Sequence, residues 1–237
     1  MKSCMTCDTK PTKNGIFRAH LEKFAKKYLP KNNKCYNNGG NKINIKNLKP
    51  NSTIFYFASN ERDFTKKIIS REKAYNKLEN SGIVNVDENG NTLMHIKCPQ
   101  LYYNSNGNIY SRHIHFVYWN DSIKDWNNDL YTLQILCDVD KEFLKKYMNK
   151  VIIVDARPLS DYKKAHFTGS VNLPYNKRWT EDSILEELKK NVKKYDCNKL
   201  APMILYCSKN CNMAKKLYIK LNKFGFYNTV HINEDLV

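Results

Sequence analysis

Two cysteines four residues apart, Cys207 and Cys211, follow a short apolar run near the end of the chain. The run, residues 203–206, predicts a buried strand, and periodic apolar positions from residue 213 onward predict a helix. Cys207 should therefore lie at the carboxyl end of a strand, where ligands bind in open α/β sheets. Backbone N–H groups at a helix start favour an anion such as a thiolate. The pKa of a thiol placed there can fall from about 8.5 into the range of about 3.5–7.5. The alternative is a buried cysteine at a strand end that only packs.

Composition limits the class of protein. The chain has 237 residues, 41% of them hydrophobic, and a formal net charge of +17, which suits one large domain or two small ones. The basic residues are spread over both halves, so they indicate a solvated basic surface that attracts nucleic acid only non-specifically. No segment has the apolar character of a signal peptide or a membrane span. We therefore expect a cytoplasmic protein without a membrane partner.

The eight cysteines are then expected to be reduced, and to serve metal binding, catalysis or packing instead of a disulfide framework. Cys4 and Cys7 form a Cys-x-x-Cys pair, and His20 and Cys35 follow. Four such ligands can hold a structural zinc ion in a tetrahedron. The spacing to His20 and Cys35 matches no zinc pattern, so we expect no cofactor and keep a structural zinc ion near Cys4 and Cys7 as the alternative.

Residues 1–130 are predicted to form a small α+β domain rich in antiparallel strands. A strand is expected at residues 53–58 and a helix at residues 62–78. Two hairpins are expected, one within residues 83–96 and one within residues 102–119. The sequence supplies no mechanism for this domain.

His113 and His115 alternate on the last predicted strand of this domain, so both rings point to one face. Together with the thiol of Cys98 on the adjoining strand, they could hold a metal ion. They could equally be polar members of an aromatic-rich face, and we favour this second interpretation.

Residues 131–237 are predicted to form a second domain. Asp138 is the expected N-cap of a short helix at residues 139–148. The continuous apolar run at residues 151–154 is typical of a strand buried on both faces, and residues 181–195 have the period of an amphipathic helix. Strands that alternate with helices in this way predict an α/β fold with a parallel sheet flanked by helices.

Four segments of this half resemble, in order, the sequence pieces of the rhodanese-like (sulfurtransferase) family: residues 154–157, 162–174, 205–207 and 221–230. The resemblance covers residues 134–232 and leaves the first half uncovered. It implies a rhodanese-like domain that moves a sulfane sulfur through a persulfide on Cys207, which is covalent catalysis by a thiolate.

By this resemblance, Cys207 is the nucleophile, and the loop residues Ser208, Lys209, Asn210, Cys211 and Asn212 bind the substrate and stabilise its charge. Asp155 and Arg157 brace the site, or else form a structural ion pair at a strand end. The sulfur donor is a small compound such as thiosulfate, or a persulfidated protein. Cys211 either resolves a persulfide or sulfenate by forming a disulfide or is an incidental small residue.

Two other functions remain open on the same scaffold. A catalytically inactive binding or regulatory module is favoured by Asn210 in place of the loop glycine, by Asn212 and Met213 where many members have Arg or Ser, and by the end of the chain at Val237. A phosphatase or arsenate reductase needs a loop one residue longer, closed by an arginine, where this chain has Met213. We rank the sulfurtransferase first and the phosphatase last.

Overall fold

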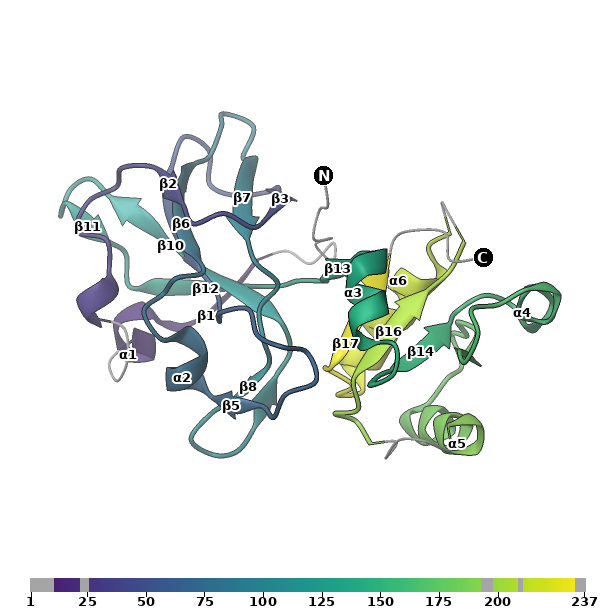
Figure 1. Cartoon of the computed structure of the whole chain (residues 1–237). Coiled ribbons are helices and arrows are strands. Elements are labelled where there is room, and N and C mark those ends of the chain that lie inside the picture. The colour runs from purple at the N-terminus through teal and green to yellow at the C-terminus, as the bar shows by residue number, and fades with distance from the viewer. Residues whose placement is uncertain (1–10, 22–25, 193–197, 209–210, 233–237) are drawn as a thin grey trace. The chain divides into compact units, whose positions relative to one another are not determined.

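The computed structural model describes residues 11–21, 26–192, 198–208 and 211–232 (Figure 1). The backbone divides into two compact units, Met1–Leu136 and Cys137–Val237. Strand β12 (Asp129–Gln134) belongs to the first unit because it pairs with two strands of that unit. Within the described ranges, no helix combines the length and the apolar character needed to cross a membrane.

A seven-stranded antiparallel sheet forms the centre of the first unit. Its order is β1-β12-β10-β4-β6-β2, and β11 pairs with β10. Besides β12, its strands are β1 (Thr12–Ile16), β2 (Tyr36–Asn37), β4 (Thr53–Phe57), β6 (Ser81–Asn85), β10 (His113–Asn120) and β11 (Asp125–Trp126).

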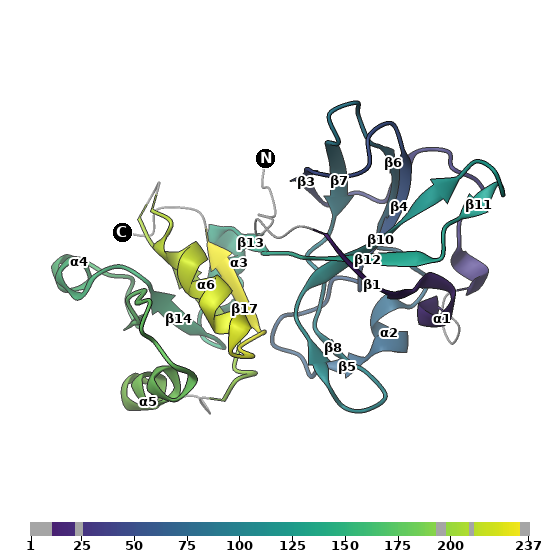
Figure 2. The same ribbon diagram turned by 180° about the vertical axis from the view of Figure 1, so that it is seen from behind.

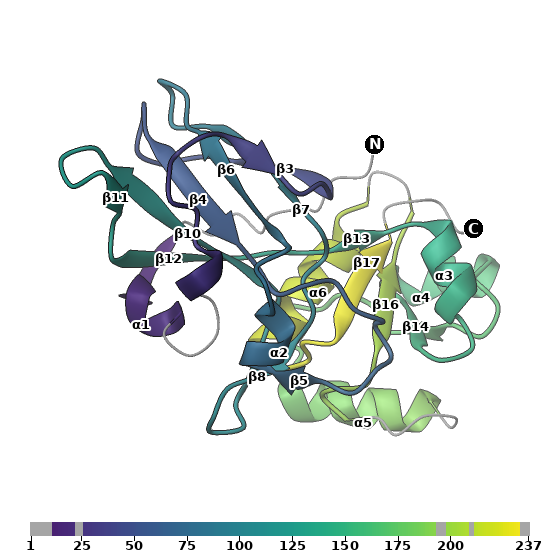
Figure 3. The same cartoon turned by 60° about the vertical axis from the view of Figure 1, so that its left-hand side comes forward.

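Among its described residues, two smaller sheets and three short helices complete the first unit. The strands are β3 (Asn41–Ile45), β5 (Ile69–Ser70), β7 (Thr92–Ile96), β8 (Tyr102–Tyr103) and β9 (Ile109–Tyr110), and the helices are α1 (Phe17–Leu21), η1 (Lys26–Tyr28) and α2 (Arg71–Tyr75). β3 pairs with β7, and β8 lies between β5 and β9. Helix α2 lies beside β5 and β8 (Figure 3). Aromatic side chains, among them Phe17, Phe55, Phe57 and Tyr75, fill the core between these elements.

The first unit corrects two sequence predictions. The expected helix at residues 62–78 is wrong except for the five residues of α2. The expected hairpin at residues 83–96 is also wrong: β6 and β7 are strands, but β6 pairs with β4 and β2, and β7 with β3. Alternating apolar residues show which face of a strand is buried, but they do not show which other strand pairs with it. The second hairpin is confirmed in part, by the antiparallel pair of β8 and β9. The rest of its expected second strand belongs to β10, which pairs with β4 and β12.

The second unit is an α/β fold around a five-stranded parallel sheet of order β13-β17-β16-β14-β15. The strands are β13 (Asp138–Val139), β14 (Ile152–Asp155), β15 (Val171–Asn172), β16 (Met203–Tyr206) and β17 (Thr229–Ile232), and the helices are α3 (Lys141–Tyr147), α4 (Leu159–Lys164), α5 (Glu181–Asn191) and α6 (Met213–Lys223). Helix α3 crosses in front of this sheet in Figure 1 and α6 in Figure 2, so they cover opposite faces. The parallel sheet flanked by helices confirms the predicted fold class.

The local sequence explains these elements. Every residue of β14 and β16 is buried, as expected for strands covered on both faces. In α6 the buried residues recur with helical spacing, and Gly225 ends the helix with a φ of 89° that favours glycine. One N-cap prediction is wrong, because α3 is capped by Asp140, whose side chain accepts a hydrogen bond from Phe143 N at 2.7 Å. Asp138 instead lies in β13 and bonds to His231 Nδ1 at 2.9 Å.

Helix α6 provides a test of this packing. Leu217 is fully buried, whereas Ile219 on the same helix is 43% exposed. Leu217→Ala should lower the free energy of unfolding by about 2–5 kcal/mol, because it leaves a cavity in the core. Ile219→Ala should change it by less than about 1 kcal/mol. Urea unfolding of both variants measures this difference, and equal effects would contradict the described orientation of α6.

Candidate active site

Cys207 follows β16 directly and precedes the first turn of α6. Its side chain is nearly inaccessible, with 5% of the residue surface exposed. The Cys207 thiol donates a hydrogen bond to the carbonyl oxygen of Cys211 at 3.0 Å. The backbone N–H of Met213 donates to Cys211 Sγ at 3.4 Å. The two thiols predicted to act together therefore share one short turn between strand and helix.

The expectation of a lowered Cys207 pKa is wrong. Burial, which penalises the charged thiolate, raises the pKa of Cys207 to about 12, and a hydrogen bond with the Cys211 side chain acts in the same direction. Backbone hydrogen bonds from Ala214 and Met213 lower this pKa, as expected at a helix start. These backbone hydrogen bonds lower the pKa of Cys207 by less than burial raises it. The burial of Cys207 cannot be read from the sequence.

Asp155 and Arg157 form an ion pair at the carboxyl end of β14. Arg157 Nε lies 3.0 Å and 3.1 Å from the two carboxylate oxygens of Asp155, and Arg157 Nη2 lies 2.6 Å from Oδ2. The Asp155 side chain is fully buried and that of Arg157 is 10% exposed. The hydrogen bond to Asp155 raises the pKa of Arg157 above its already high ordinary value. A permanent positive charge is thus fixed beside the end of the central strands.

Strand pairing brings this ion pair towards Cys207. Asp155 pairs with Tyr206 in the β14–β16 register, and the Ala156 N–H donates to the Tyr206 carbonyl at 3.0 Å. The Arg157 guanidinium lies 5.7 Å from the centre of the Tyr206 ring. The Tyr206 hydroxyl accepts a hydrogen bond from Phe167 N at 3.1 Å, and burial raises its pKa to about 12. Tyr206 is a site residue that sequence reasoning did not select, although it stands directly before Cys207.

The other predicted loop residues are less closely engaged. Ser208 and Asn212 are exposed, and the Asn212 side chain makes no capping hydrogen bond to α6. Lys209 and Asn210 lie outside the described residues, as do Cys4 and Cys7 of the zinc alternative. Of the other residues named for zinc, Cys35 is an exposed free thiol, and His20 packs against the rings of Tyr75 and His115.

One expectation about the cysteines is wrong. Cys98 and Cys137 are each disulfide-bonded, whereas the sequence led us to expect no disulfide. Cys35, Cys207 and Cys211 are free thiols. Spacing along the chain does not show which sulfur atoms meet in the fold, so the sequence could not predict that these two cysteines are bonded.

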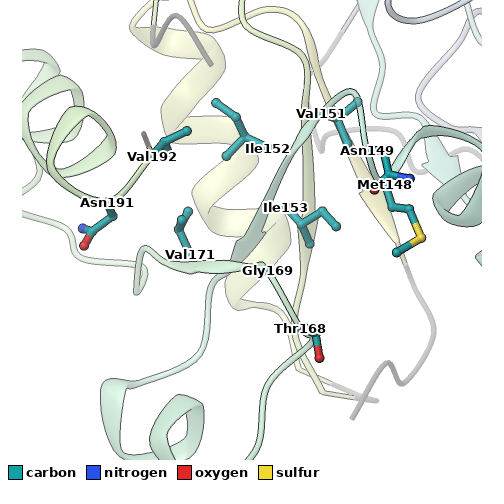
Figure 4. A pocket seen from close by; sticks show the side chains of 10 residues that line it. All are labelled: Met148, Asn149, Val151, Ile152, Ile153, Thr168, Gly169, Val171, Asn191 and Val192. Carbon is teal, nitrogen blue, oxygen red and sulfur yellow. The ribbon is translucent and has the colours of Figure 1, made fainter. Parts of the chain in front are cut away.

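A cavity of about 230 Å³ lies beside β14 and is separate from Cys207 (Figure 4). Its wall includes Ile152, Val171 and Val192, with the hydroxyl of Thr168 and the amide of Asn191 among the polar groups. Its lining residues include no charged side chain, histidine or cysteine. This cavity is therefore not part of the candidate site at Cys207.

The family model of the rhodanese-like domain matches residues 140–235. This half of the chain is a rhodanese-like domain. The match includes the ion pair of Asp155 and Arg157, together with Cys207 and the turn that follows it. No curated protein sequence is similar enough to the chain to count as a match.

Solved structures similar to the rhodanese-like domain come from several organisms. The BH2092 protein from Bacillus halodurans is 26% identical, with a TM-score of 0.32, over 40% of this chain and 64% of its own. An uncharacterised protein from Saccharomyces cerevisiae is 24% identical (TM-score 0.31; 40% and 80% covered). The human single-domain sulfurtransferase TSTD1 is 10% identical (TM-score 0.32; 40% and 88% covered). The chain thus spans less than two thirds of the Bacillus protein.

The ion pair yields a stability prediction. Asp155→Asn should lower the free energy of unfolding by about 3–5 kcal/mol, because it leaves the Arg157 guanidinium without its buried counter-charge. Asp161→Asn is the matched control, since Asp161 pairs with Lys164 at 3.7 Å on the surface and should cost less than about 1 kcal/mol. Urea unfolding compares the two variants. Equal effects would contradict the described burial of the pair.

The raised pKa of Cys207 predicts how its reactivity depends on pH. A group titrating near 12 is almost entirely protonated at neutral pH, so its thiolate fraction rises about tenfold for each pH unit. Alkylation of Cys207 by iodoacetamide should therefore keep accelerating between about pH 6 and about pH 10. Peptide mass spectrometry measures the rate at this site. A plateau near pH 8.5, like that of free cysteine, would contradict the prediction.

Proposed function

We propose that the rhodanese-like domain transfers a sulfane sulfur through a persulfide on Cys207. The observation that carries the proposal is the position of this thiol between the end of β16 and the first turn of α6. Backbone hydrogen bonds from Met213 and Ala214 favour its anionic form. The same N–H groups would stabilise the negative charge of a persulfide and of the transition state that leads to it.

The proposed reaction has two steps. The Cys207 thiolate first attacks the outer sulfur of a donor such as thiosulfate, whose S–S bond breaks as sulfite leaves with the electron pair. A nucleophilic acceptor such as cyanide then attacks the outer sulfur of the persulfide, and the Cys207 thiolate leaves. Before the first step, the thiol must lose the proton that it now donates to the Cys211 carbonyl. The raised pKa of Cys207 makes this proton loss part of the barrier.

The surroundings of the turn suit an anionic donor. Lys215 and Lys216 lie in the first part of α6, and the chain as a whole is strongly basic. Such a charge attracts small anions and acidic proteins to the surface. Ser208 and Asn212 are exposed, so both of these residues face solvent. Thiosulfate and a persulfidated protein are therefore the donor classes that we propose.

Cys211 has a defined part in this proposal. Its side chain forms a hydrogen bond that raises the pKa of Cys207, so the two sulfur atoms are neighbours. As a thiolate, Cys211 would attack the inner sulfur of the persulfide, release hydrosulfide and leave a Cys207–Cys211 disulfide. An external thiol would then be needed to reduce that disulfide before the next turnover.

A second candidate function is a catalytically inactive binding module. It is favoured by the 5% exposure of Cys207 and by its pKa of about 12, because a buried, protonated thiol is a poor nucleophile. No observation favours the phosphatase alternative.

The sequence-based proposal of a cytoplasmic location meets an opposing observation. Cys98 and Cys137 are disulfide-bonded, and disulfides persist mainly in oxidising compartments. Counting the free thiols of the chain isolated from its host cell would decide between a reducing and an oxidising compartment. Free thiols at Cys98 and Cys137 would support the cytoplasmic location.

Thiosulfate-to-cyanide sulfur transfer tests the proposed function. The native chain should produce thiocyanate, and Cys207→Ser should lose at least about 99% of that activity, because serine cannot form a persulfide. The rate should also rise with pH, following the thiolate fraction of Cys207. Cys35→Ser is the matched control, since it removes an exposed free thiol of the other unit and should leave the activity unchanged.

The comparison with Cys211→Ser separates the two roles of Cys211. If Cys211 resolves the persulfide, this variant should keep cyanide-dependent transfer and lose the release of hydrosulfide. If neither the native chain nor the two variants produced thiocyanate, the catalytically inactive binding module would be the better account.

A further inference from the structure

Three side chains of the first unit bring donor atoms together in its interior. His113 and His115 lie on one face of β10, and both are buried. Tyr102 of β8 is buried beside them, and its hydroxyl lies 2.9 Å from His113 Nε2. Two buried imidazoles and a buried phenol in a largely apolar core are costly unless their polar atoms are satisfied. We call these three residues the Tyr-His-His cluster.

Hydrogen bonds at the far side of each ring fix its orientation. His113 Nδ1 lies 2.6 Å from the carbonyl oxygen of Ser111, which can only accept, so Nδ1 carries the proton. In the neutral ring, His113 Nε2 therefore presents a lone pair. His115 Nδ1 lies 2.8 Å from Thr132 Oγ1, which turns His115 Nε2 towards His113. Histidines that bind metals are typically held in this way, by a hydrogen bond at the nitrogen that does not bind.

More polar atoms surround His113 Nε2 than its single lone pair can accept hydrogen bonds from. His115 Nε2 lies 3.1 Å away, and the hydroxyls of Tyr102 and Tyr75 lie 2.9 Å and 3.4 Å away. One lone pair accepts one good hydrogen bond. A cation placed between Tyr102, His113 and His115 would use a lone pair from each of them at once.

The spacing of these atoms agrees with metal binding. Two nitrogens bound to one tetrahedral zinc ion at 2.0–2.1 Å are about 3.3 Å apart. The separations of 3.1 Å between the imidazole nitrogens and 2.9 Å between phenol and imidazole are shorter than that value by about 0.2 Å and about 0.4 Å. Small side-chain movements would suffice to admit the ion.

We propose that Tyr102, His113 and His115 bind a divalent transition-metal ion of the zinc or cobalt type. Among the residues that the structure describes, no group of three or more His, Cys, Asp or Glu side chains is arranged to hold a metal ion. The phenol is therefore the essential third donor. This proposal reverses our sequence-based preference for a purely structural role of His113 and His115, and it is independent of the proposed sulfur transfer.

The site would keep an open coordination position. A cavity of about 280 Å³ adjoins the cluster, and its wall includes Arg71, Asn104, Tyr110 and Gln134 besides the three ligands. Catalytic zinc sites differ from structural ones in keeping such a position for water or substrate. The cavity is large enough for a small ligand, and the guanidinium on its wall would suit an anionic group. The site is therefore of the open kind.

Cobalt binding to the full chain tests the proposal. After removal of adventitious metal, the native chain should bind one Co²⁺ per molecule at this cluster. His113→Gln and His115→Gln should each weaken that binding by at least about tenfold. His95→Gln is the matched control, because His95 lies on β7 of the same unit outside the cluster and should bind as the native chain does.

The cobalt spectrum identifies the ligands without relying on a variant. Binding at Tyr102, His113 and His115 should give only the weak visible bands of nitrogen and oxygen ligands, whereas binding at cysteines adds an intense sulfur-to-cobalt band. Zn²⁺ should also displace the phenol proton of Tyr102, which near-ultraviolet difference absorption detects in the native chain. No bound cobalt, unchanged affinity in both folded variants, or a sulfur-to-cobalt band alone would overturn the proposal.

Discussion

The buried ion pair between Asp155 and Arg157 organises the carboxyl edge of the parallel sheet in the rhodanese-like domain. The Asp155 carbonyl accepts hydrogen bonds from Leu173 N and from the Asn172 side chain, so β14 is tied to the segment that contains β15. Arg157 Nη2 also donates to the Ala165 carbonyl at 2.8 Å, which holds the end of α4. An unpaired charge at this depth would be strongly destabilising, so the loops of this edge have little freedom to rearrange around it.

Cys207, next to this edge, rests as a buried and protonated thiol. The β14–β16 register places Tyr206 opposite Asp155 and makes Cys207 the first residue beyond the sheet. Burial favours the protonated thiol more strongly than the helix start favours the thiolate. The thiol must therefore lose this proton before or while a donor binds in the turn. This requirement distinguishes an active sulfurtransferase, in which the anion forms when substrate binds, from a module that only retains the scaffold.

The sequence predicted the second unit better than the first, for physical reasons. Buried parallel strands such as β14 and β16 are continuous apolar runs, and the end of α6 is marked by Gly225, so the pattern alone locates them. In the first unit, most pairings join strands distant in sequence, and alternation does not name the partner, as β6 and β7 show. Cys207, Asp155 and Arg157 were proposed as site residues from local motifs. The pKa of Cys207 and the convergence of Tyr102 on His113 depend on burial and on contacts between separate strands, which no local pattern encodes.

The most direct test of the central claim is the mass of Cys207 after exposure to a sulfur donor. The native chain would be incubated with thiosulfate, freed of excess donor, trapped with an alkylating reagent and digested for mass spectrometry. The account predicts that the peptide with Cys207 gains the mass of one sulfur atom, that cyanide removes it, and that the peptide with the exposed Cys35 does not gain it. A Cys207 peptide without added sulfur at any donor concentration, in a chain that remains folded, would contradict the persulfide mechanism.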